Sequence, residues 1–128
     1  MKTVLFLCDP KYDIDVDFSF IDENTILITN GQSGQEEAAI DYAARKGASV
    51  VSYHRRYLFP GKINKSMFLR AQIVMTMKIS DEVRIVLGTR KKTNAALLAC
   101  VGVAGAKKKT YIYNGNNWSK IVQAKEKK

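Results

Sequence analysis

The chain has 128 residues, 46% hydrophobic and 26% charged, which is ordinary for one globular domain with its own core. No apolar run approaches the roughly 18 residues that span a bilayer, and the start MKTVLFLCD turns acidic too soon for a signal peptide, so a cytoplasmic protein without membrane contact is expected. Cys8 and Cys100 lie far apart, with no C-x-x-C pattern and no nearby histidine. Their placement argues against a disulfide framework and against a metal site.

The net charge of +9 is unevenly distributed along the chain. Residues 1–61 hold six Lys or Arg against nine Asp or Glu, whereas residues 62–128 hold fifteen against three. This asymmetry favours an anionic partner on the surface that the second half builds. The alternative is that the lysines only keep the protein in solution, which the closing KEKK suggests for the last few charges.

The first half of the chain predicts a βαβ unit. TVLFLC (3–8) is a near-continuous apolar run, typical of a strand that is covered on both faces. A second strand at 25–29 is followed by an Ala-rich helix from Gly34 to Gly47 and by a third strand at 48–53, so the sheet is expected to be parallel here with a right-handed crossover.

Residues 9–24, between the first two strands, give a mixed signal. DIDVDF (13–18) alternates acidic and apolar residues as a strand does, but Pro10 and the acidic density also allow a loop with a short helix. The D-x-D-x-D spacing lacks the glycine and the distal Glu of an EF-hand loop. A solvated acidic edge is therefore preferred to a Ca²⁺ site.

The second half of the chain adds a predicted helix, strand, helix and strand. These are expected at 65–78, 83–88, 94–106 and 107–115, although the apolar IVMTM within the first helix is also compatible with a strand. Trp118 is expected to anchor the remaining tail. We therefore predict one α/β domain over 1–115, with a mostly parallel sheet between helices, and a basic C-terminal tail over 116–128.

The loop from Asn30 to Gly34 has the composition of an anion cradle. Its glycines allow a close backbone approach, and the free N–H groups of the following helix point at a ligand. A plain strand-to-helix turn is the alternative, because the loop lacks both the third Rossmann glycine and the Walker lysine. Ser33 is not predicted to be a nucleophile, since Gln35 replaces the last glycine of G-x-S-x-G and no acid orients His54.

Two further segments are expected at the same edge of the sheet. TRKKT (89–93) gathers basic and hydroxyl side chains at another helix start, and the basic loop after residue 53 includes aromatic rings that suit base stacking. Lys107 to Lys109 instead precede the last strand and lie at its opposite end if that strand is parallel. Asp9 and Glu36 are the carboxylates expected nearest the crevice, but no acid/base pair is evident.

These segments resemble the SLOG superfamily, the Rossmann-like group that includes the SMF/DprA and LOG proteins, and most closely its small stand-alone members. The likeness covers about residues 25–113 and rests on TNGQSGQEEAAIDYAARKG, on PGKINKSM (60–67) in the place of a Gly-x-x-Arg-Asn-x-x-Met element, and on Gly88 to Ala99. Such a resemblance implies a Rossmann-like fold and a nucleotide pocket. The P-G-G-x-G-T-x-x-E motif of catalytic LOG proteins is absent, so phosphoribohydrolase activity is not predicted.

The predicted function is binding of a nucleotide or nucleotide-derived phosphorylated ligand, with no catalytic residue, no metal and no other cofactor. Single-stranded nucleic-acid binding is the first alternative and a nucleoside- or nucleotide-processing enzyme the second. A homo-oligomer is compatible with the sequence, as is a viral or mobile-element origin. The ligand-binding residues are predicted to be Asn30, Gly31, Gln32, Ser33, Gly34, Lys62, Asn64, Lys65, Gly88, Arg90, Lys92 and Thr93. The residues predicted to contact bases or nucleic acid are Tyr53, His54, Arg55, Arg56 and Tyr57.

Overall fold

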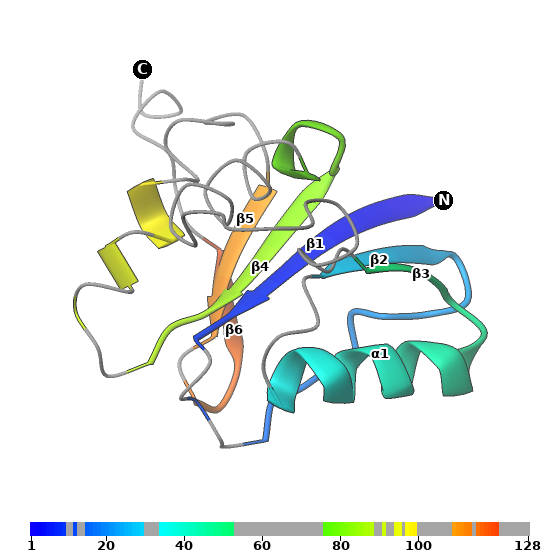
Figure 1. Ribbon diagram of the computed structural model, residues 1–128, viewed down its shortest axis with the longest axis horizontal. Helices are drawn as coiled ribbons and strands as arrows, with labels where there is room; N and C mark the ends of the chain where they lie inside the picture. The colour runs from blue at the N-terminus through cyan, green and yellow to red at the C-terminus, as the bar shows by residue number, and fades with distance from the viewer. Residues whose placement is uncertain are drawn as a thin grey trace, which may run out of the picture.

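The computed structural model of the chain describes residues 1–9, 12, 15–29, 34–52, 76–88, 91, 94–95, 97–99, 109–113 and 115–120. In these residues, strands and one long helix follow each other in the order that Figure 1 shows. They are β1 (Lys2–Cys8), β2 (Thr25–Thr29), α1 (Gly34–Lys46), β3 (Ser49–Ser52), β4 (Glu82–Val86), β5 (Lys109–Tyr113) and β6 (Trp118–Lys120).

The strands form one sheet in the order β3-β2-β1-β4-β5-β6. Each pair from β3 to β5 is parallel, and only β6 runs antiparallel to its neighbour β5. The α/β class with a mostly parallel sheet is therefore confirmed. Because β2 and β3 extend the sheet on one side of β1 and β4 extends it on the other, the direction of strand addition reverses between β1 and β4.

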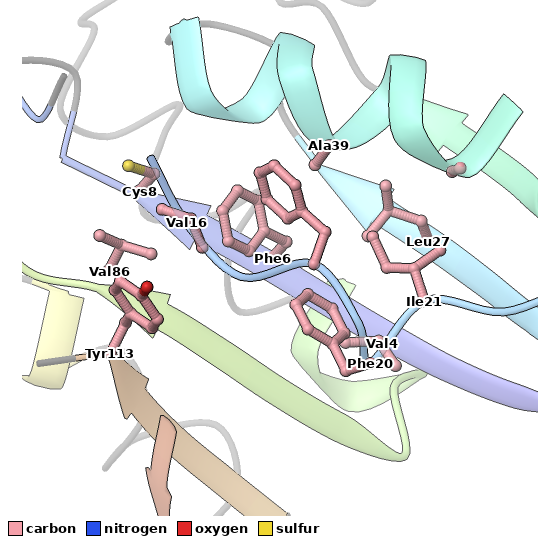
Figure 2. Close-up of a cluster of buried hydrophobic side chains, with 12 residues drawn as sticks. Val4, Phe6, Cys8, Val16, Phe20, Ile21, Leu27, Ala39, Val86 and Tyr113 are labelled. Atoms are coloured by element: carbon pink, nitrogen blue, oxygen red, sulfur yellow. The ribbon is translucent and has the colours of Figure 1, made fainter. Parts of the chain in front are cut away.

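The core lies on both faces of the sheet, as the apolar run of β1 predicted. Side chains of β1 alternate between the faces, and all from Val4 to Cys8 are buried. Val4, Phe6 and Cys8 join a cluster that includes Ala39 and Ala43 of α1 (Figure 2). The opposite face holds a second cluster, formed by Leu5, Leu7, Ile28, Met77, Val83, Ile85 and Leu97.

Helical residues from two other segments contribute to that second cluster. Thr76 to Lys78, the described end of the helix predicted over 65–78, are helical, and Met77 is completely buried. Asn94, Ala95 and 97–99 are helical where the next helix was predicted, and Leu97 is buried. Helical structure therefore covers both faces of the sheet within the described part of the chain.

Residues 15–21 cover the first face without joining the sheet. Val16, Phe18 and Phe20 are buried, whereas Asp15, Asp17 and Ser19 between them are exposed. This alternation is that of a strand, but no strand is assigned here and the buried rings instead pack on Phe6 of β1. The predicted solvated acidic edge is correct for the two aspartates; Asp13 lies outside the described residues.

β6 is a correction to the sequence analysis, in which β5 was the last strand. Trp118 begins β6, and its ring packs against Tyr113 of β5 and edge-to-face against Phe20, with ring centroids 5.0 and 5.4 Å apart. Its indole N–H donates a hydrogen bond to the carbonyl oxygen of Asp17 at 2.8 Å. Within the described residues, the predicted anchoring by Trp118 is confirmed for the segment that forms β6.

Candidate functional site

The described residues predicted to bind a ligand lie at the carboxyl ends of the parallel strands. Gly34 opens α1, whose N-terminus lies at this edge, and Gly88 follows β4 (Figure 1). Since the carboxyl ends of parallel strands share one edge, the ends of β1, β2 and β4 meet there. This is the edge at which open α/β sheets bind ligands.

Asp9 lies at the point where the strand order reverses. It directly follows β1, is completely buried, and donates its backbone N–H to the carbonyl oxygen of Val86 at 3.0 Å. Its carboxyl group lies against Gly88: a Cβ built on Gly88 would be 2.8 Å from Asp9 Cγ. The end of β1 and the start of the loop after β4 are thus in close contact.

Glu36 ties the first turn of α1 to the end of β1. Only 3% of its surface is exposed, and its Oε2 accepts a hydrogen bond from the backbone N–H of Cys8 at 3.2 Å. A carboxylate in the first turn of a helix is favoured by the helix dipole. Two buried carboxyl groups, those of Asp9 and Glu36, therefore lie at this edge. The sequence analysis named the same two as the carboxylates nearest the predicted crevice.

Asn94 closes the basic loop that follows β4. Its Oδ1 accepts a hydrogen bond from the N–H of Gly88 at 3.1 Å, and its Nδ2 donates to the carbonyl oxygen of Gly88 at 2.9 Å. These two bonds join the ends of the segment 88–94 near the carboxyl end of β4. Lys91, the described basic residue of the loop, is exposed.

The two described glycines of the predicted site differ in their surroundings. A Cβ on Gly34 would meet no atom within 4 Å, whereas a Cβ on Gly88 would collide with Asp9. The other predicted site residues lie outside the described part of the chain: Asn30, Gly31, Gln32, Ser33, Tyr53, His54, Arg55, Arg56, Tyr57, Lys62, Asn64, Lys65, Arg90, Lys92 and Thr93.

Thr29 is a polar residue at this edge that the sequence analysis did not single out. It ends β2, is completely buried, and immediately precedes the predicted anion loop. Its hydroxyl makes no hydrogen bond within the described residues. Its position after an apolar run was the only signal in the sequence.

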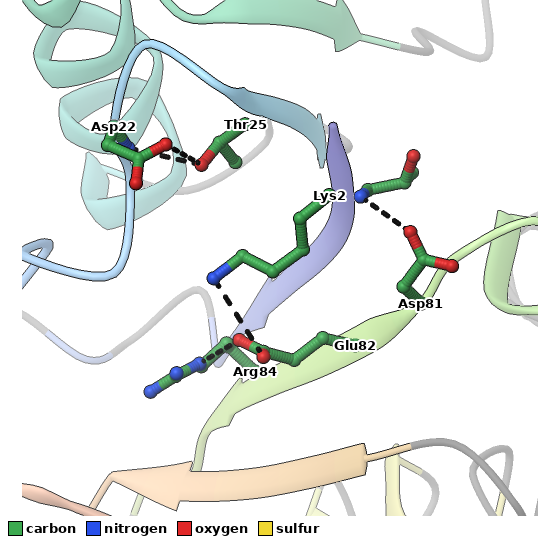
Figure 3. A network of polar contacts seen from close by, with 7 residues as sticks. Lys2, Asp22, Thr25, Asp81, Glu82 and Arg84 are labelled. Atoms are coloured by element: carbon green, nitrogen blue, oxygen red, sulfur yellow. Dashed lines mark hydrogen bonds and ion pairs between the residues drawn. The ribbon is translucent and has the colours of Figure 1, made fainter.

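A hollow of about 610 Å³ lies at the opposite edge of the sheet, where the parallel strands begin. It is lined by Met1, Lys2, Asp22, Asn24, Asp81, Glu82 and Lys109. Asp81 Oδ2 accepts a hydrogen bond from the N–H of Thr3 at 2.9 Å, and Lys2 lies 4.0 Å from Glu82 (Figure 3). Lys109 begins the parallel strand β5. The basic run 107–109 therefore ends at the edge opposite the predicted site, as expected for a parallel strand.

The carboxyl group of Asp22, which lines this hollow, has a lowered pKa. The N–H of Asn24 donates to Asp22 Oδ1 at 2.9 Å, and the hydroxyl of Thr25 donates to the same oxygen at 3.0 Å. These two bonds, the first being the larger cause, lower the pKa of the Asp22 carboxyl below its ordinary value. The carboxylate caps the turn that leads into β2.

Arg84 is the centre of an interaction that sequence analysis missed. Its Nε lies 2.6 Å from Glu82 Oε2, and both side chains are largely buried. The guanidinium group lies 4.6 Å from the Phe20 ring centroid, 4.0 Å from that of Tyr111 and 5.1 Å from that of Trp118. The available signal was the two-residue spacing of Glu82 and Arg84, which places both on one face of β4.

Comparison of the chain with known protein families, with curated proteins and with solved structures found no match. Within the described ranges, no three His, Cys, Asp or Glu side chains are grouped so that they would hold a metal ion. None of the helices in those ranges has the length and apolar character needed to cross a membrane.

Proposed function

We propose that this chain is a Rossmann-like protein that binds a nucleotide or nucleotide-derived phosphorylated molecule at the carboxyl edge of its sheet. The observation that carries the proposal is the reversal of strand order between β1 and β4. In open α/β sheets the loops at such a point diverge and leave a crevice for a ligand. The order β3-β2-β1-β4-β5 is also that of the parallel strands in dinucleotide-binding folds.

The two predicted phosphate sites at this edge, the segment 30–34 before α1 and the loop after β4, differ in the charge of the residues around them. The first turn of α1 already contains Glu36 and Glu37, whose charges oppose a further anion at that helix end. The loop closed by Asn94 holds exposed Lys91 between Arg90 and Lys92 in sequence. We therefore infer that phosphate binds at the loop after β4, and that the segment 30–34 contacts a less charged part of the ligand.

The ligand is identified by native mass spectrometry of protein purified from cells, which reports a carried-over small molecule directly. Calorimetric titration with nucleoside mono- and diphosphates then compares Lys92→Glu with Lys109→Glu, which makes the same charge change at the opposite edge. Loss of one charged phosphate contact costs about 1.5–3 kcal/mol, so Lys92→Glu is expected to weaken binding by about tenfold or more. Lys109→Glu is expected to leave it nearly unchanged. Equal losses in the two variants contradict the proposed site.

The alternative of single-stranded nucleic-acid binding is tested by the same titration with an oligonucleotide. Contact with many phosphates makes affinity fall steeply with salt, whereas a pocket for one or two phosphates responds weakly. Tighter binding of the oligonucleotide than of any mononucleotide, with a steep salt dependence, contradicts the proposal and supports the alternative.

A further inference from the structure

The space beside Gly88 is occupied by the carboxyl group of Asp9. Among the described residues, the three atoms nearest to a Cβ built on Gly88 all belong to Asp9: Oδ2 is the closest, followed by Cγ at 2.8 Å and Cβ at 3.1 Å. Asp9 directly follows β1, and Gly88 lies just after β4. The contact therefore lies where the strand order reverses, at the edge where we propose that the ligand binds.

A glycine in this position of a nucleotide-binding sheet commonly serves the ligand. Because glycine has no Cβ, the backbone of a loop that follows a strand can approach a phosphate closely. At Gly88 an anionic group already fills the space that the missing side chain leaves, but this group belongs to the chain itself. Carboxylates and phosphates are bound by the same groups, N–H donors and cationic side chains. The two anions are therefore candidates for one position.

The backbone of Asp9 is fixed by hydrogen bonds, so only its side chain can leave Gly88. The Asp9 N–H donates to the carbonyl oxygen of Val86 at 3.0 Å, which continues the pairing of β1 with β4. The Asp9 carbonyl oxygen accepts hydrogen bonds from the Tyr12 N–H at 3.0 Å and from the Cys8 thiol at 3.4 Å. A change of rotamer moves the carboxyl group without breaking any of these three bonds.

The burial of Asp9 favours an exchange of anions over the addition of a second one. Asp9 is completely buried, and like charges repel strongly where water is excluded. A phosphate that bound at Gly88 beside the carboxylate would meet this repulsion. A carboxylate that rotates toward solvent escapes it and regains hydration that burial had removed.

We propose that Asp9 is an internal competitor of the ligand: its carboxylate holds the position at Gly88 that a phosphate of the ligand takes, and it rotates away when the phosphate binds. This inference rests on the proposed function and adds an autoinhibitory contact to the same site. Wild-type affinity for phosphate is then lower than the loop after β4 would give without Asp9. A substitution that neutralises or shortens the Asp9 side chain is expected to strengthen binding.

Calorimetric titration of the full chain with inorganic phosphate and with nucleoside monophosphates tests the proposal. Asp9→Asn keeps the size of the side chain and removes its charge, and Asp9→Ser also clears space beside Gly88. Both variants are expected to bind these probes about tenfold or more tightly than the wild type, because the opposing like charge is gone. Glu36→Gln is the matched control: it neutralises the other buried carboxyl group of this edge, which is bonded to the Cys8 N–H, and is expected to change affinity much less. Circular dichroism establishes that each variant is folded.

The direction of the change decides the outcome. Equal affinity of wild type and Asp9→Asn overturns the proposal, and so does weaker binding by Asp9→Asn, which would mean that the carboxylate assists the ligand. An equal gain in Glu36→Gln also overturns it, because affinity would then follow the general charge of the edge. If wild type and both Asp9 variants bind none of the probes, the proposed function itself is contradicted, so the two failures are distinguishable.

Discussion

The carboxyl group of Asp9 occupies the space that a side chain at Gly88 would require. A Cβ on Gly88 would lie 2.8 Å from Cγ and 3.1 Å from Cβ of Asp9, and Asp9 is completely buried. Real Cβ atoms essentially never lie within 3.0 Å of a heavy atom elsewhere in the chain. A side chain at position 88 and the carboxyl group of Asp9 therefore cannot both be accommodated without a shift. The contact explains why a glycine stands at position 88, just after β4, without any reference to a ligand. It also places the Asp9 carboxyl at the point where the strand order reverses.

Gly88→Ala is therefore expected to destabilise the protein by about 1–3 kcal/mol, the usual cost of overfilling a packed site. Replacing Asp9 with Ala in the same protein removes the colliding carboxyl and is expected to reduce that cost. A double-mutant cycle by urea denaturation measures the coupling between the two positions. Gly34→Ala is the control: its Cβ has open space, so no steric loss is expected. Additive effects of the Gly88 and Asp9 changes contradict the proposed contact.

Asn94 is expected to hold the loop after β4 through its two bonds to Gly88. Asn94→Ala removes both bonds and is expected to cost about 1–3 kcal/mol, at the net value of a typical hydrogen bond or slightly above. Asn94→Asp retains the acceptor for the Gly88 N–H but turns a second oxygen toward the Gly88 carbonyl oxygen, so its loss is expected to be at least as large. Thermal denaturation gives the ranking. Equal stability of Asn94→Ala and wild type would show that the loop does not depend on this side chain.

Arg84 is expected to be a stabilising residue and not a ligand contact. Replacing it with Met leaves Glu82 buried and, among the described residues, paired with Lys2 alone at 4.0 Å, so a loss of about 3 kcal/mol is expected. Arg84→Lys keeps the charge but not the planar group that stacks on Tyr111, and an intermediate loss is expected. Adding Glu82→Gln to Arg84→Met is expected to recover part of the stability, which urea denaturation measures. No recovery in the double variant contradicts the role assigned to the ion pair.

The lowered pKa of Asp22 predicts a stability difference that depends on pH. A carboxyl with a lowered folded-state pKa stabilises the fold above its unfolded pKa, near 3.9, and the stabilisation is lost as pH falls through the folded-state value. Asp22→Asn is therefore expected to be less stable than wild type at neutral pH, with the difference shrinking below about pH 4. Denaturation of the wild type and of Asp22→Asn at neutral pH and below about pH 4 measures this difference. A difference that does not change with pH would show that the charge of the Asp22 carboxylate does not stabilise the fold.

The regular elements were predictable from the sequence where local pattern and burial agree. β2 matches its predicted range of 25–29, and β1 and α1 differ from theirs by one residue or less at each end. β1 was recognisable because it is buried on both faces and therefore apolar throughout. β4 was predicted over 83–88 but spans Glu82–Val86, since Glu82 pairs with Val4 of β1 and Lys109 of β5 and the pairing stops before Gly88.

The parts that sequence analysis missed depend on contacts between distant residues. In the described part of the alternating segment, 15–18, the apolar residues are buried and the aspartates exposed, as the pattern indicates, but a pattern of period two does not reveal whether backbone groups pair in a sheet. β6 has three residues and no apolar run; its pairing with β5 and the Trp118 contacts with Phe6 and Phe20 are long-range. At the candidate site, the edge of the sheet followed from topology, whereas the packing of Asp9 on Gly88 did not.

The central claim, a nucleotide-type ligand at the carboxyl edge, is tested most directly by NMR titration of the amide-labelled protein with nucleoside phosphates. We predict saturable shifts at Gly34, Gly88, Lys91 and Asn94, with little change at Asn24 and Lys109 on the opposite edge. The same shifts are expected to be lost in Lys92→Glu and retained in Lys109→Glu. No saturable shifts with any nucleoside phosphate, or shifts confined to the opposite edge, would contradict the claim.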